Sequence, residues 1–477
     1  MTNLSSLAAE LNLELIGPDT SLSGVAQNSS LVKPGYLFAA LNGQKFNGLD
    51  FAQDALSKGA VALLVSKESI EQAKKFGLPI LVCSDPLLVL GDICQRVFDI
   101  SGLRLFAVTG TNGKTSTVSY LAWLLEKLGL STGFSASTMR KLGNQVLESN
   151  LTTPQVSEVY ELLSQMKQAG NQAAVFEVSA QALIRHRVDG LRFEISGFTN
   201  LSRDHLDDFS SMNDYLEAKK LLFTKHSQFS VINVEDEYGR ALAESLPDSV
   251  TIGSSGSWTY QASSGIPARL SANFDSQHFE CEVPAGSLMA KNLALAVAIA
   301  LSAGFQGSEI QKALEKVDLV VPGRLQRVSE KSPAVFVDYA HTPAGVEAAV
   351  AELRKSYGHL VVVLAASGNR DQGKRPAMAH AASSADLVVV TDQHPRDEDP
   401  ALIRATLVSS LLEELPPQNV VEIADPKAAI AHAISSASAN GAVLWCGPGH
   451  LKYREVAGVK VPFDALAIAK DLVEGKS

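Results

Sequence analysis

The sequence is poor in cysteine, and the cysteines it has are scattered. Only four occur in 477 residues, each among apolar neighbours and none with the spacing of metal ligands or of a disulfide framework: Cys83, Cys94, Cys281 and Cys446. We therefore expect four reduced thiols in the core of a cytoplasmic protein.

Long apolar runs are also missing. The first residues, Met1–Leu7, lack the positive charge and the apolar stretch of a signal peptide. The alanine-rich stretch at 288–301 is interrupted by Lys291 and Asn292. We expect no signal peptide and no membrane span.

Positive charge is scarce as well. Lys and Arg number 41 against 51 Asp and Glu, which gives a net charge of −10, and no long basic run occurs. Nucleic acid is therefore not an expected partner, and any phosphate must be bound by a local loop rather than by a general field. The length and the 46% share of hydrophobic residues are those of a soluble globular protein of about three domains.

Strand and helix patterns divide the chain into three α/β regions. Residues 1–100 combine short apolar strands with turn signals, which is typical of a small α/β unit. In the region 101–320, helices are expected at 115–128 and 154–169, and a strand at 173–178. This alternation predicts a mainly parallel sheet flanked by helices.

The region 321–477 repeats the alternation and is expected to be a separate Rossmann-like domain. Apolar strands are expected at 334–337, 360–365, 387–390 and 442–445. In open α/β sheets ligands bind beyond the carboxyl ends of strands. Polar clusters stand at those positions: Asp338-Tyr-Ala-His341, Ser367-Gly-Asn-Arg370, Thr391-Asp-Gln-His-Pro-Arg396 and Gly447-Pro-Gly-His450.

A glycine-rich loop is the most informative segment. An apolar strand ends in Gly110-Thr111-Asn112-Gly113-Lys114-Thr115-Ser116, and a helical pattern follows at once. Such a loop turns its backbone N–H groups onto phosphate, while the lysine reaches the β and γ phosphates and the Thr hydroxyl ligates Mg²⁺. Two residues separate the glycines where a standard P-loop has four, so a chance Gly-Lys-Thr helix start is the alternative. The flanking strand and helix favour an ATP-consuming enzyme.

Three further residues could complete a magnesium site near the γ-phosphate. Glu177 ends an apolar strand, and His205 follows another strand at Phe198. Each has a structural alternative, a salt-bridged strand end for the glutamate and a buried structural histidine. Lys219, taken alone, would be a solvated residue on a helix.

Together these segments resemble the Mur ligases, and most closely the MurE-type branch that adds the third peptide residue to a peptidoglycan precursor. The resemblance spans nearly the full length, and its motifs fall in the family's order. They are Thr109-Gly-Thr-Asn-Gly-Lys-Thr-Ser116, Thr152-Thr-Pro154, Glu177-Val-Ser179, Arg185-His-Arg187, Phe198–Asp207, Glu217-Ala-Lys219, Gly323-Arg324, Asp338-Tyr-Ala-His-Thr-Pro343 and Gly373-Lys-Arg-Pro376.

The resemblance implies three domains, a uridine-nucleotide domain (1–100), a P-loop-like ATPase (101–320) and a Rossmann-like domain that brings the amino acid (321–477). It implies small-molecule substrates: ATP, UDP-MurNAc-L-Ala-D-Glu and a diamino acid. The γ-phosphoryl group would pass to the D-glutamate carboxylate, and the amine would attack the resulting acyl phosphate. A monomer that closes around its ligands is compatible with this layout.

Carried over residue by residue, the resemblance implies four sets of site residues. Lys114, Glu177, His205 and Lys219 would be catalytic, and Mg²⁺ would be held by Thr115, Glu177, His205 and Lys219 as a carbamate formed with CO₂. ATP would contact the loop 110–116, Asn292, Arg324, Asp338 and His341. The UDP-MurNAc-dipeptide would contact Ser29, Thr152, Thr153, Ser179, Arg185 and Arg187. The amino acid would contact Arg370, Gln393, His394, Arg396, Gly447 and Leu451.

The sequence departs from the family in two places. Asn28-Ser29-Ser30 replaces the usual Asp-Ser-Arg, and Leu451 replaces the glutamate expected to receive the distal ammonium of diaminopimelate. Losing the partner of a buried ammonium costs about 1–3 kcal/mol, enough to change the preferred substrate. Arg370 and Arg396 favour meso-diaminopimelate, with L-lysine and L-ornithine as alternatives.

Two other functions stay open at this point. One is a different ligase of the same superfamily, of the folylpolyglutamate or cyanophycin type, which the Thr152-Thr-Pro154 segment and the small N-terminal region oppose. The other is a non-catalytic nucleotide-binding scaffold, which is opposed by the presence of Lys114, Thr115, Glu177, His205 and Lys219.

Overall fold

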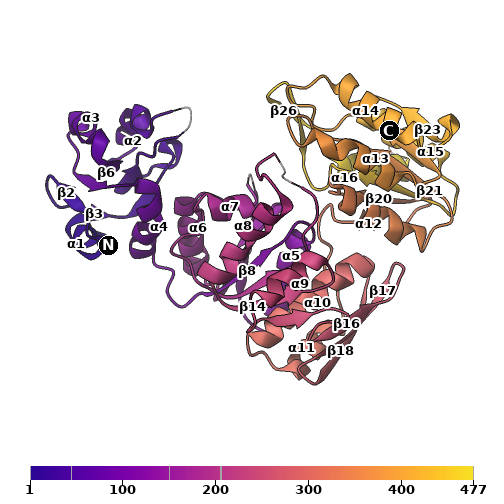
Figure 1. The fold of residues 1–477 in the computed structure, drawn as a ribbon, viewed down its shortest axis with the longest axis horizontal. Helices are drawn as coiled ribbons and strands as arrows, with labels where there is room; N and C mark the ends of the chain where they lie inside the picture. The colour runs from indigo at the N-terminus through magenta and orange to yellow at the C-terminus, as the bar shows by residue number, and fades with distance from the viewer. Residues whose placement is uncertain (1, 44–45, 150, 205–206, 476–477) are drawn as a thin grey trace. The chain divides into compact units, whose positions relative to one another are not determined.

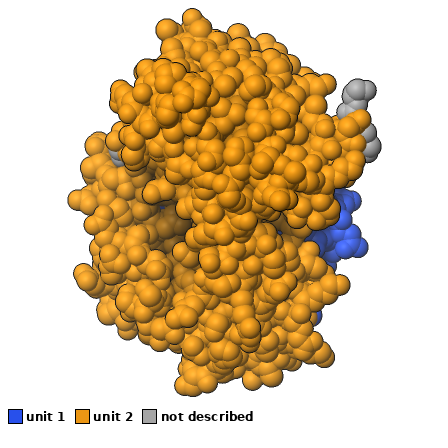
Figure 2. All heavy atoms as spheres, turned by 90° about the vertical axis from the view of Figure 1, so that its right-hand side faces the viewer, with its two compact units in different colours: residues 1–109, 129–196, 218–230 blue, residues 110–128, 197–217, 231–477 orange. Residues whose placement is uncertain are grey.

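The computed structural model describes residues 2–43, 46–149, 151–204 and 207–475. Contacts within the chain define two compact units, one made of residues 1–109, 129–196 and 218–230, the other of 110–128, 197–217 and 231–477 (Figure 2). Figure 1 labels many of the helices and strands. None of the described helices is long and apolar enough to cross a membrane.

The N-terminal region forms a small α/β fold on a five-stranded sheet of order β2-β7-β6-β5-β4. Four strands run parallel and β2 pairs antiparallel with β7. The strands are β2 (Glu14–Ile16), β4 (Gly24–Ala26), β5 (Tyr36–Ala39), β6 (Ala60–Ser66) and β7 (Ile80–Cys83), beside the short pair β1 (Thr2–Asn3) and β3 (Ser21–Leu22). The helices are α1 (Leu4–Leu11), α2 (Ala52–Ser57), α3 (Ile70–Ala73) and α4 (Pro86–Val97).

An eight-stranded sheet of order β11-β10-β9-β12-β8-β13-β14-β15 follows. Strands β9, β12 and β8 run parallel, as do β14 and β15, and β10 and β11 add an antiparallel hairpin. The strands are β8 (Arg104–Thr109), β9 (Thr132–Ser135), β10 (Met139–Leu142), β11 (Gln145–Glu148), β12 (Ala173–Glu177), β13 (Phe193–Phe198), β14 (Ser227–Asn233) and β15 (Val250–Ile252).

Most helices of this region bury either one face or their whole surface. They are α5 (Lys114–Lys127), α6 (Val156–Gln168), α7 (Ala180–Ile184), α8 (Met212–Lys225), α9 (Glu237–Glu244), α10 (Ser287–Ser302) and α11 (Gly307–Leu314). The expected helices at 115–128 and 154–169 are thus confirmed as α5 and α6. An antiparallel three-stranded sheet, which the sequence patterns did not predict, contains β16 (Thr259–Ala262), β17 (Ala268–Phe274) and β18 (Gln277–Val283).

The C-terminal region has a six-stranded sheet of order β19-β20-β24-β21-β22-β23, parallel except for β19. Its strands are β19 (Gln326–Arg327), β20 (Ala334–Asp338), β21 (Leu360–Leu364), β22 (Leu387–Val390), β23 (Val420–Glu422) and β24 (Ala442–Cys446). All four strands expected here are confirmed. A hairpin of β25 (Tyr453–Val456) and β26 (Val459–Pro462) was not predicted.

Alternate residues of these strands build two separate cores, one on each face of the sheet. Val362 and Leu364 of β21 belong to one core, and Val361 and Val363 belong to the other. The covering helices are α12 (Pro343–Arg354), α13 (Arg375–Ala382), α14 (Pro400–Leu412), α15 (Pro426–Ser436) and α16 (Ala465–Glu474). A sheet buried on both faces explains why its strands are continuous apolar runs.

Several helices begin at an oxygen-bearing side chain followed by proline. Asp85, Thr342, Asp399 and Asp425 each accept a hydrogen bond from a backbone N–H in the first turn, and Pro86, Pro343, Pro400 and Pro426 follow them. The side-chain oxygen satisfies a free donor, and the fixed φ of proline suits the first helical position.

All four cysteines are buried and unbridged, as expected. Burial raises the pKa of the Cys83 thiol to about 11 and that of Cys281 to about 12, and burial also raises the pKa values of Cys94 and Cys446. The thiols therefore stay protonated near neutral pH.

A glycine in α4 allows a direct backbone contact within the first unit. A Cβ atom added at Gly91 would lie 2.5 Å from the carbonyl oxygen of Asp189 and 2.6 Å from its carbonyl carbon. Both are backbone atoms, which cannot move aside as a side chain can.

We predict that Gly91→Ala destabilises the protein, although Gly→Ala inside a helix normally stabilises by about 0.5–1 kcal/mol. Overpacking against the Asp189 backbone should cost about 1–3 kcal/mol and lower the melting temperature in calorimetry. Gly358→Ala is the control, because an added Cβ there meets nothing within 4 Å. A Gly91→Ala protein as stable as the wild type would contradict the prediction.

Candidate active site

The glycine-rich loop lies between β8 and α5 and is held by the segment that follows β13. The N–H of Thr111 donates to the Asn200 carbonyl (2.8 Å), and the N–H of Asn112 donates to Asn200 Oδ1 (3.0 Å). The Thr199 hydroxyl donates to the Asn112 carbonyl (2.7 Å). Gly110 has φ +144°, and a Cβ there would collide with the Thr199 hydroxyl. The loop conformation is therefore fixed by its neighbours.

The lysine and the hydroxyl residues of this loop open α5. Lys114 Nζ donates to the Thr111 carbonyl (2.8 Å), and Thr115 and Ser116 are buried. Gly113, the residue before the helix, has φ +82°, a conformation that glycine adopts without strain. The first turn of α5 therefore presents N–H groups and the positive end of a helix, which suits a phosphate.

Asn292 on α10 packs directly on the loop. A Cβ added at Gly113 would collide with Asn292 Oδ1, and the Thr117 hydroxyl donates to the same oxygen (3.4 Å). The structure therefore brings Asn292 to the loop, and its contact with ATP stays a prediction.

Arg324 comes to the loop from the C-terminal region, and Asp338 holds the backbone beside it. The Arg324 guanidinium donates to the Thr115 hydroxyl (3.2 Å). Its central carbon lies 4.5 Å from the centre of the Tyr339 ring. The Asp338 carboxylate accepts from the N–H groups of Leu325 (2.5 Å) and Ala340 (2.6 Å). Burial raises the pKa of Asp338, although Arg324 opposes the shift. Sequence reasoning missed Tyr339, whose ring supports the guanidinium.

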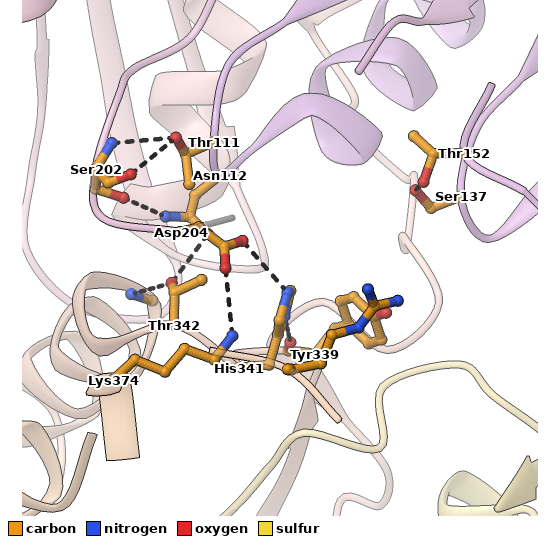
Figure 3. Close-up of polar contacts among 12 residues, drawn as sticks. Thr111, Asn112, Ser137, Thr152, Ser202, Asp204, Tyr339, His341, Thr342 and Lys374 are labelled. Carbon is orange, nitrogen blue, oxygen red and sulfur yellow. Dashed lines mark hydrogen bonds and ion pairs between the residues drawn. The ribbon is translucent and has the colours of Figure 1, made fainter. Parts of the chain in front are cut away.

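A buried ion pair ties the segment after β13 to the C-terminal region (Figure 3). Lys374 Nζ lies 3.3 Å from Asp204 Oδ1, and both side chains are almost fully buried. His341 Nε2 lies 3.8 Å from the other carboxylate oxygen, and the Tyr339 carbonyl contacts His341 Nδ1 at 2.8 Å. Asp204 and Lys374 were not singled out as site residues, although both lie in family-like segments.

In the first unit, Glu177 at the end of β12 is held by Ser137. The N–H of Ser137 donates to Glu177 Oε2 (2.9 Å) and its hydroxyl donates to Oε1 (3.0 Å). The hydroxyls of Ser137 and Thr152 are 2.8 Å apart (Figure 3). Sequence reasoning missed Ser137; its place just after β9, at the carboxyl edge of the sheet, is the signal that could have found it.

Thr153, Ser179 and Arg187 form a connected group beside Glu177. The Thr153 hydroxyl donates to the Glu177 carbonyl (2.9 Å) and accepts from the Ser179 N–H (3.1 Å). Arg187 donates to the Thr153 carbonyl (3.0 Å) and is buried, whereas Arg185 is exposed. The Nε atom of Arg187 is buried and has no hydrogen-bond partner among the described residues. Its burial and the charge of Arg185 lower the pKa of Arg187.

The predicted metal ligands are divided between the two units. Glu177 and Lys219 belong to the first and Thr115 to the second, while His205 lies outside the described residues. Lys219 is only 1% exposed, so the alternative of a solvated helix lysine is wrong. Within the described ranges, no three His, Cys, Asp or Glu side chains gather in a way that would hold a metal ion. Ser29, the predicted uridine-nucleotide contact, is buried in a short 3₁₀ turn, Ser29–Leu31.

The residues predicted to contact the amino acid lie at the carboxyl ends of β21, β22 and β24. Arg396 donates from Nε to Glu455 (3.1 Å) and from a terminal nitrogen to the Gly368 carbonyl (3.1 Å). Gln393 and His394 are buried, Gly447 follows β24 with φ +108°, and Leu451 is half-buried. Arg370 is exposed, with Asp207 at 3.9 Å.

Models of one protein family match three successive stretches of the chain. They are described as Mur ligase family, catalytic domain (residues 21–96), Mur ligase middle domain (108–300) and Mur ligase, glutamate ligase domain (323–449). A UDP-N-acetylmuramyl-tripeptide synthetase of Leifsonia xyli subsp. xyli is 39% identical over 482 residues, which cover 97% of this chain and 94% of that protein. The chain belongs to the Mur ligase family.

Two further comparisons agree. A UDP-N-acetylmuramoyl-L-alanyl-D-glutamate--2,6-diaminopimelate ligase of Aquifex aeolicus is 34% identical and covers 99% of the chain and 98% of its own length. A solved structure of a ligase with the same name superposes with a TM-score of 0.66 at 27% identity, covering 96% of this chain and 97% of that one. The predicted family and three-domain α/β fold are therefore confirmed. This Mur ligase is an ATP-dependent ligase and not a non-catalytic scaffold.

His394 generates a prediction about acid stability. Its Nδ1 accepts from the N–H of Glu455 (2.9 Å), and burial, with the charges of Arg396 and Arg454, lowers its pKa to about 4. In the unfolded chain this histidine takes up a proton near pH 6.5, which is its ordinary pKa. The folded protein therefore loses stability as the pH falls from about 6.5 towards 4.

We predict that His394→Asn makes this Mur ligase less sensitive to acid. An Asn oxygen can replace the Nδ1 acceptor but does not titrate. Between about pH 7 and pH 5 the wild type should lose about 2 kcal/mol more unfolding free energy than the variant, measured by urea unfolding. The control is His278→Asn, which changes an exposed histidine on β18. Equal losses in wild type and His394→Asn would refute the prediction.

Proposed function

We propose that this Mur ligase joins meso-diaminopimelate to the D-glutamate carboxylate of UDP-MurNAc-L-Ala-D-Glu, with ATP converted to ADP and phosphate. The observation that carries the proposal is the hydrogen bond that Arg324 donates to the Thr115 hydroxyl of the phosphate loop. Relatives that match nearly the whole chain are named as a tripeptide synthetase and a 2,6-diaminopimelate ligase. The three-domain division at residues 100 and 320, the cytoplasmic location and the monomeric state stay predictions.

The chemistry requires two anions to meet. The γ-phosphoryl group of ATP is transferred to a carboxylate oxygen, and ADP is the leaving group. The amine then attacks the resulting acyl phosphate and expels phosphate. Lys114 and Arg324 supply positive charge where negative charge gathers on the phosphate. Mg²⁺, when bound, would neutralise the phosphate oxygens further. Asp338 orients the backbone around Arg324 by accepting hydrogen bonds from the N–H groups of Leu325 and Ala340.

The first unit fits an anionic peptide. We propose that Thr152, Thr153, Ser179, Arg185 and Arg187 bind the muramoyl-dipeptide, with Ser29 at the uridine nucleotide. The Nε of Arg187, which has no acceptor among the residues the structure describes, supports this role, because a buried donor without an acceptor is costly and a substrate carboxylate would satisfy it. Ser137, by holding both oxygens of Glu177, keeps that carboxylate in one orientation.

The proposed magnesium ligands are oxygen donors of the kind that Mg²⁺ prefers: the Thr115 hydroxyl, the Glu177 carboxylate and Lys219 as a carbamate, with His205 as a fourth. The burial of Lys219 supports a role inside the site rather than on the solvated surface of the helix.

The ion pair between Arg396 and Glu455 supports meso-diaminopimelate as the amine substrate. The distal centre of meso-diaminopimelate carries one carboxylate and one ammonium, whereas L-lysine and L-ornithine carry the ammonium alone. A guanidinium and a carboxylate held side by side complement the zwitterion. Glu455 stands in a hairpin that the sequence patterns did not predict, and it supplies a carboxylate where Leu451 cannot.

We predict phosphate release from ATP only when UDP-MurNAc-L-Ala-D-Glu and a suitable diamino acid are both present. meso-Diaminopimelate should give the highest kcat/KM, about tenfold or more above L-lysine and L-ornithine. Lys114→Ala is the inactive control. No turnover with any of the three amines would reject the proposal, and turnover with folate and glutamate instead would favour the folylpolyglutamate type.

We predict that Lys219→Ala abolishes ligation and that a short-chain carboxylate such as acetate partly restores it, because the added carboxylate can replace the carbamate oxygens. The control is Lys220→Ala, at the neighbouring half-buried position of α8. Activity would be followed as phosphate release, and mass spectrometry would detect the carbamate. An active Lys219→Ala enzyme would show that this lysine is only structural.

A further inference from the structure

A glutamate of the C-terminal region caps a helix of the ATP-binding region. Glu352 lies near the end of α12 and is 1% exposed. Its Oε1 accepts from the N–H of Ser287, the first residue of α10, and its Oε2 accepts from the Ser287 hydroxyl, both at 2.5 Å. These bonds satisfy a donor that a helix start leaves free.

The residue that would normally supply the cap cannot do so. Gly286 precedes α10, has no side chain and adopts φ +88°. A Cβ added there would lie 2.6 Å from Glu352 Oε1. The glycine therefore makes room for a carboxylate that arrives from a helix 65 residues further along the chain.

The capped turn leads straight to Asn292. The Asn292 amide donates from Nδ2 to the carbonyl of Leu288, the residue after Ser287, at 2.9 Å. Its Oδ1 packs on Gly113 of the phosphate loop and accepts from Thr117 (3.4 Å). If the first turn of α10 frays, the Leu288 carbonyl moves and the Asn292 side chain loses its anchor.

The other end of α12 meets the same loop. The hydroxyl of Thr342, the N-cap of α12, lies 3.4 Å from Asn112 Oδ1 (Figure 3). The helix is thus held at both ends, by Asn112 at its start and by Ser287 near its end. Lys355, whose Nζ lies 3.5 Å from Glu352 Oε2, is half exposed.

We propose that Glu352 is a positioning residue of the nucleotide site: by capping α10 it fixes Asn292 on the phosphate loop. The inference needs only the ATP dependence of the enzyme, and not the peptide or amine substrates proposed above. A buried cap that served stability alone would leave nucleotide affinity unchanged in the folded protein.

The test is calorimetric binding of ADP with Mg²⁺ to the full chain. Glu352→Ala should weaken binding about five- to tenfold, because it removes both acceptor oxygens of the cap. Glu352→Gln keeps an oxygen acceptor and should stay within about twofold of the wild type. The control, Glu347→Ala, changes an exposed glutamate on the same helix and should bind as the wild type does.

Kinetics gives a second measurement. In Glu352→Ala the KM for ATP should rise by the same factor while kcat changes less than about twofold. Wild-type ADP affinity in Glu352→Ala, a Glu352→Gln as weak as Glu352→Ala, or a fall in kcat at unchanged KM would each overturn the proposal.

If Glu352→Ala fails to fold, Ser287→Ala takes its place. It removes one of the two donors and should weaken ADP binding about two- to threefold. Unchanged ADP affinity in that variant would overturn the proposal. ADP binding uses neither the muramoyl peptide nor the diamino acid, so a failed substrate panel and a failed capping test are distinguishable.

Discussion

The phosphate loop depends on close backbone contact with the segment after β13. Gly110 can approach that segment only because it lacks a Cβ, and the N–H groups of Thr111 and Asn112 are bound by Asn200. The loop is therefore held in one shape by the protein itself rather than by the nucleotide. Such preorganisation lets the remaining N–H groups meet phosphate without first being rearranged. The positions of Lys114, Thr115 and Asn292 all follow from it.

A second layer of contacts joins the loop to residues far away in the sequence. Arg324 reaches Thr115, and its guanidinium rests on the ring of Tyr339 while the Asp338 carboxylate holds the backbone beside it. None of these side chains is near the loop in the chain. The proposed ATP site is thus assembled from segments that the contacts of α10 and α12 hold together.

Local patterns predicted the fold best where the periodicity was strong. The strands of the C-terminal sheet are continuous apolar runs, so their positions were readable, and so were α5 and α6 with their glycine stops. Strands β17 and β18 alternate buried apolar residues with polar ones such as Asn273 and Glu280, and they were missed because the prediction followed the continuous apolar runs of a buried parallel sheet. The hairpin β25–β26 is short and exposed, which leaves little hydrophobic signal.

Site residues could be predicted from the sequence only where they lie in segments with a recognisable motif. Ser137 was missed because its role appears only through its bonds to Glu177, which lies 40 residues away in the chain. Glu455 and Glu352 were missed for the same reason: each acts on a residue from another part of the chain. The burial of Lys219 likewise depends on how α8 packs, which periodicity alone does not determine.

The buried state of the four cysteines has a practical consequence. Their protonated, inaccessible thiols react poorly with maleimides and other electrophiles, since the thiolate is the reactive form. A cysteine introduced on the surface would therefore be the dominant target for a spectroscopic probe. Pairs of such probes, one on each of two regions, would report the distances between them during turnover in an otherwise unaltered enzyme.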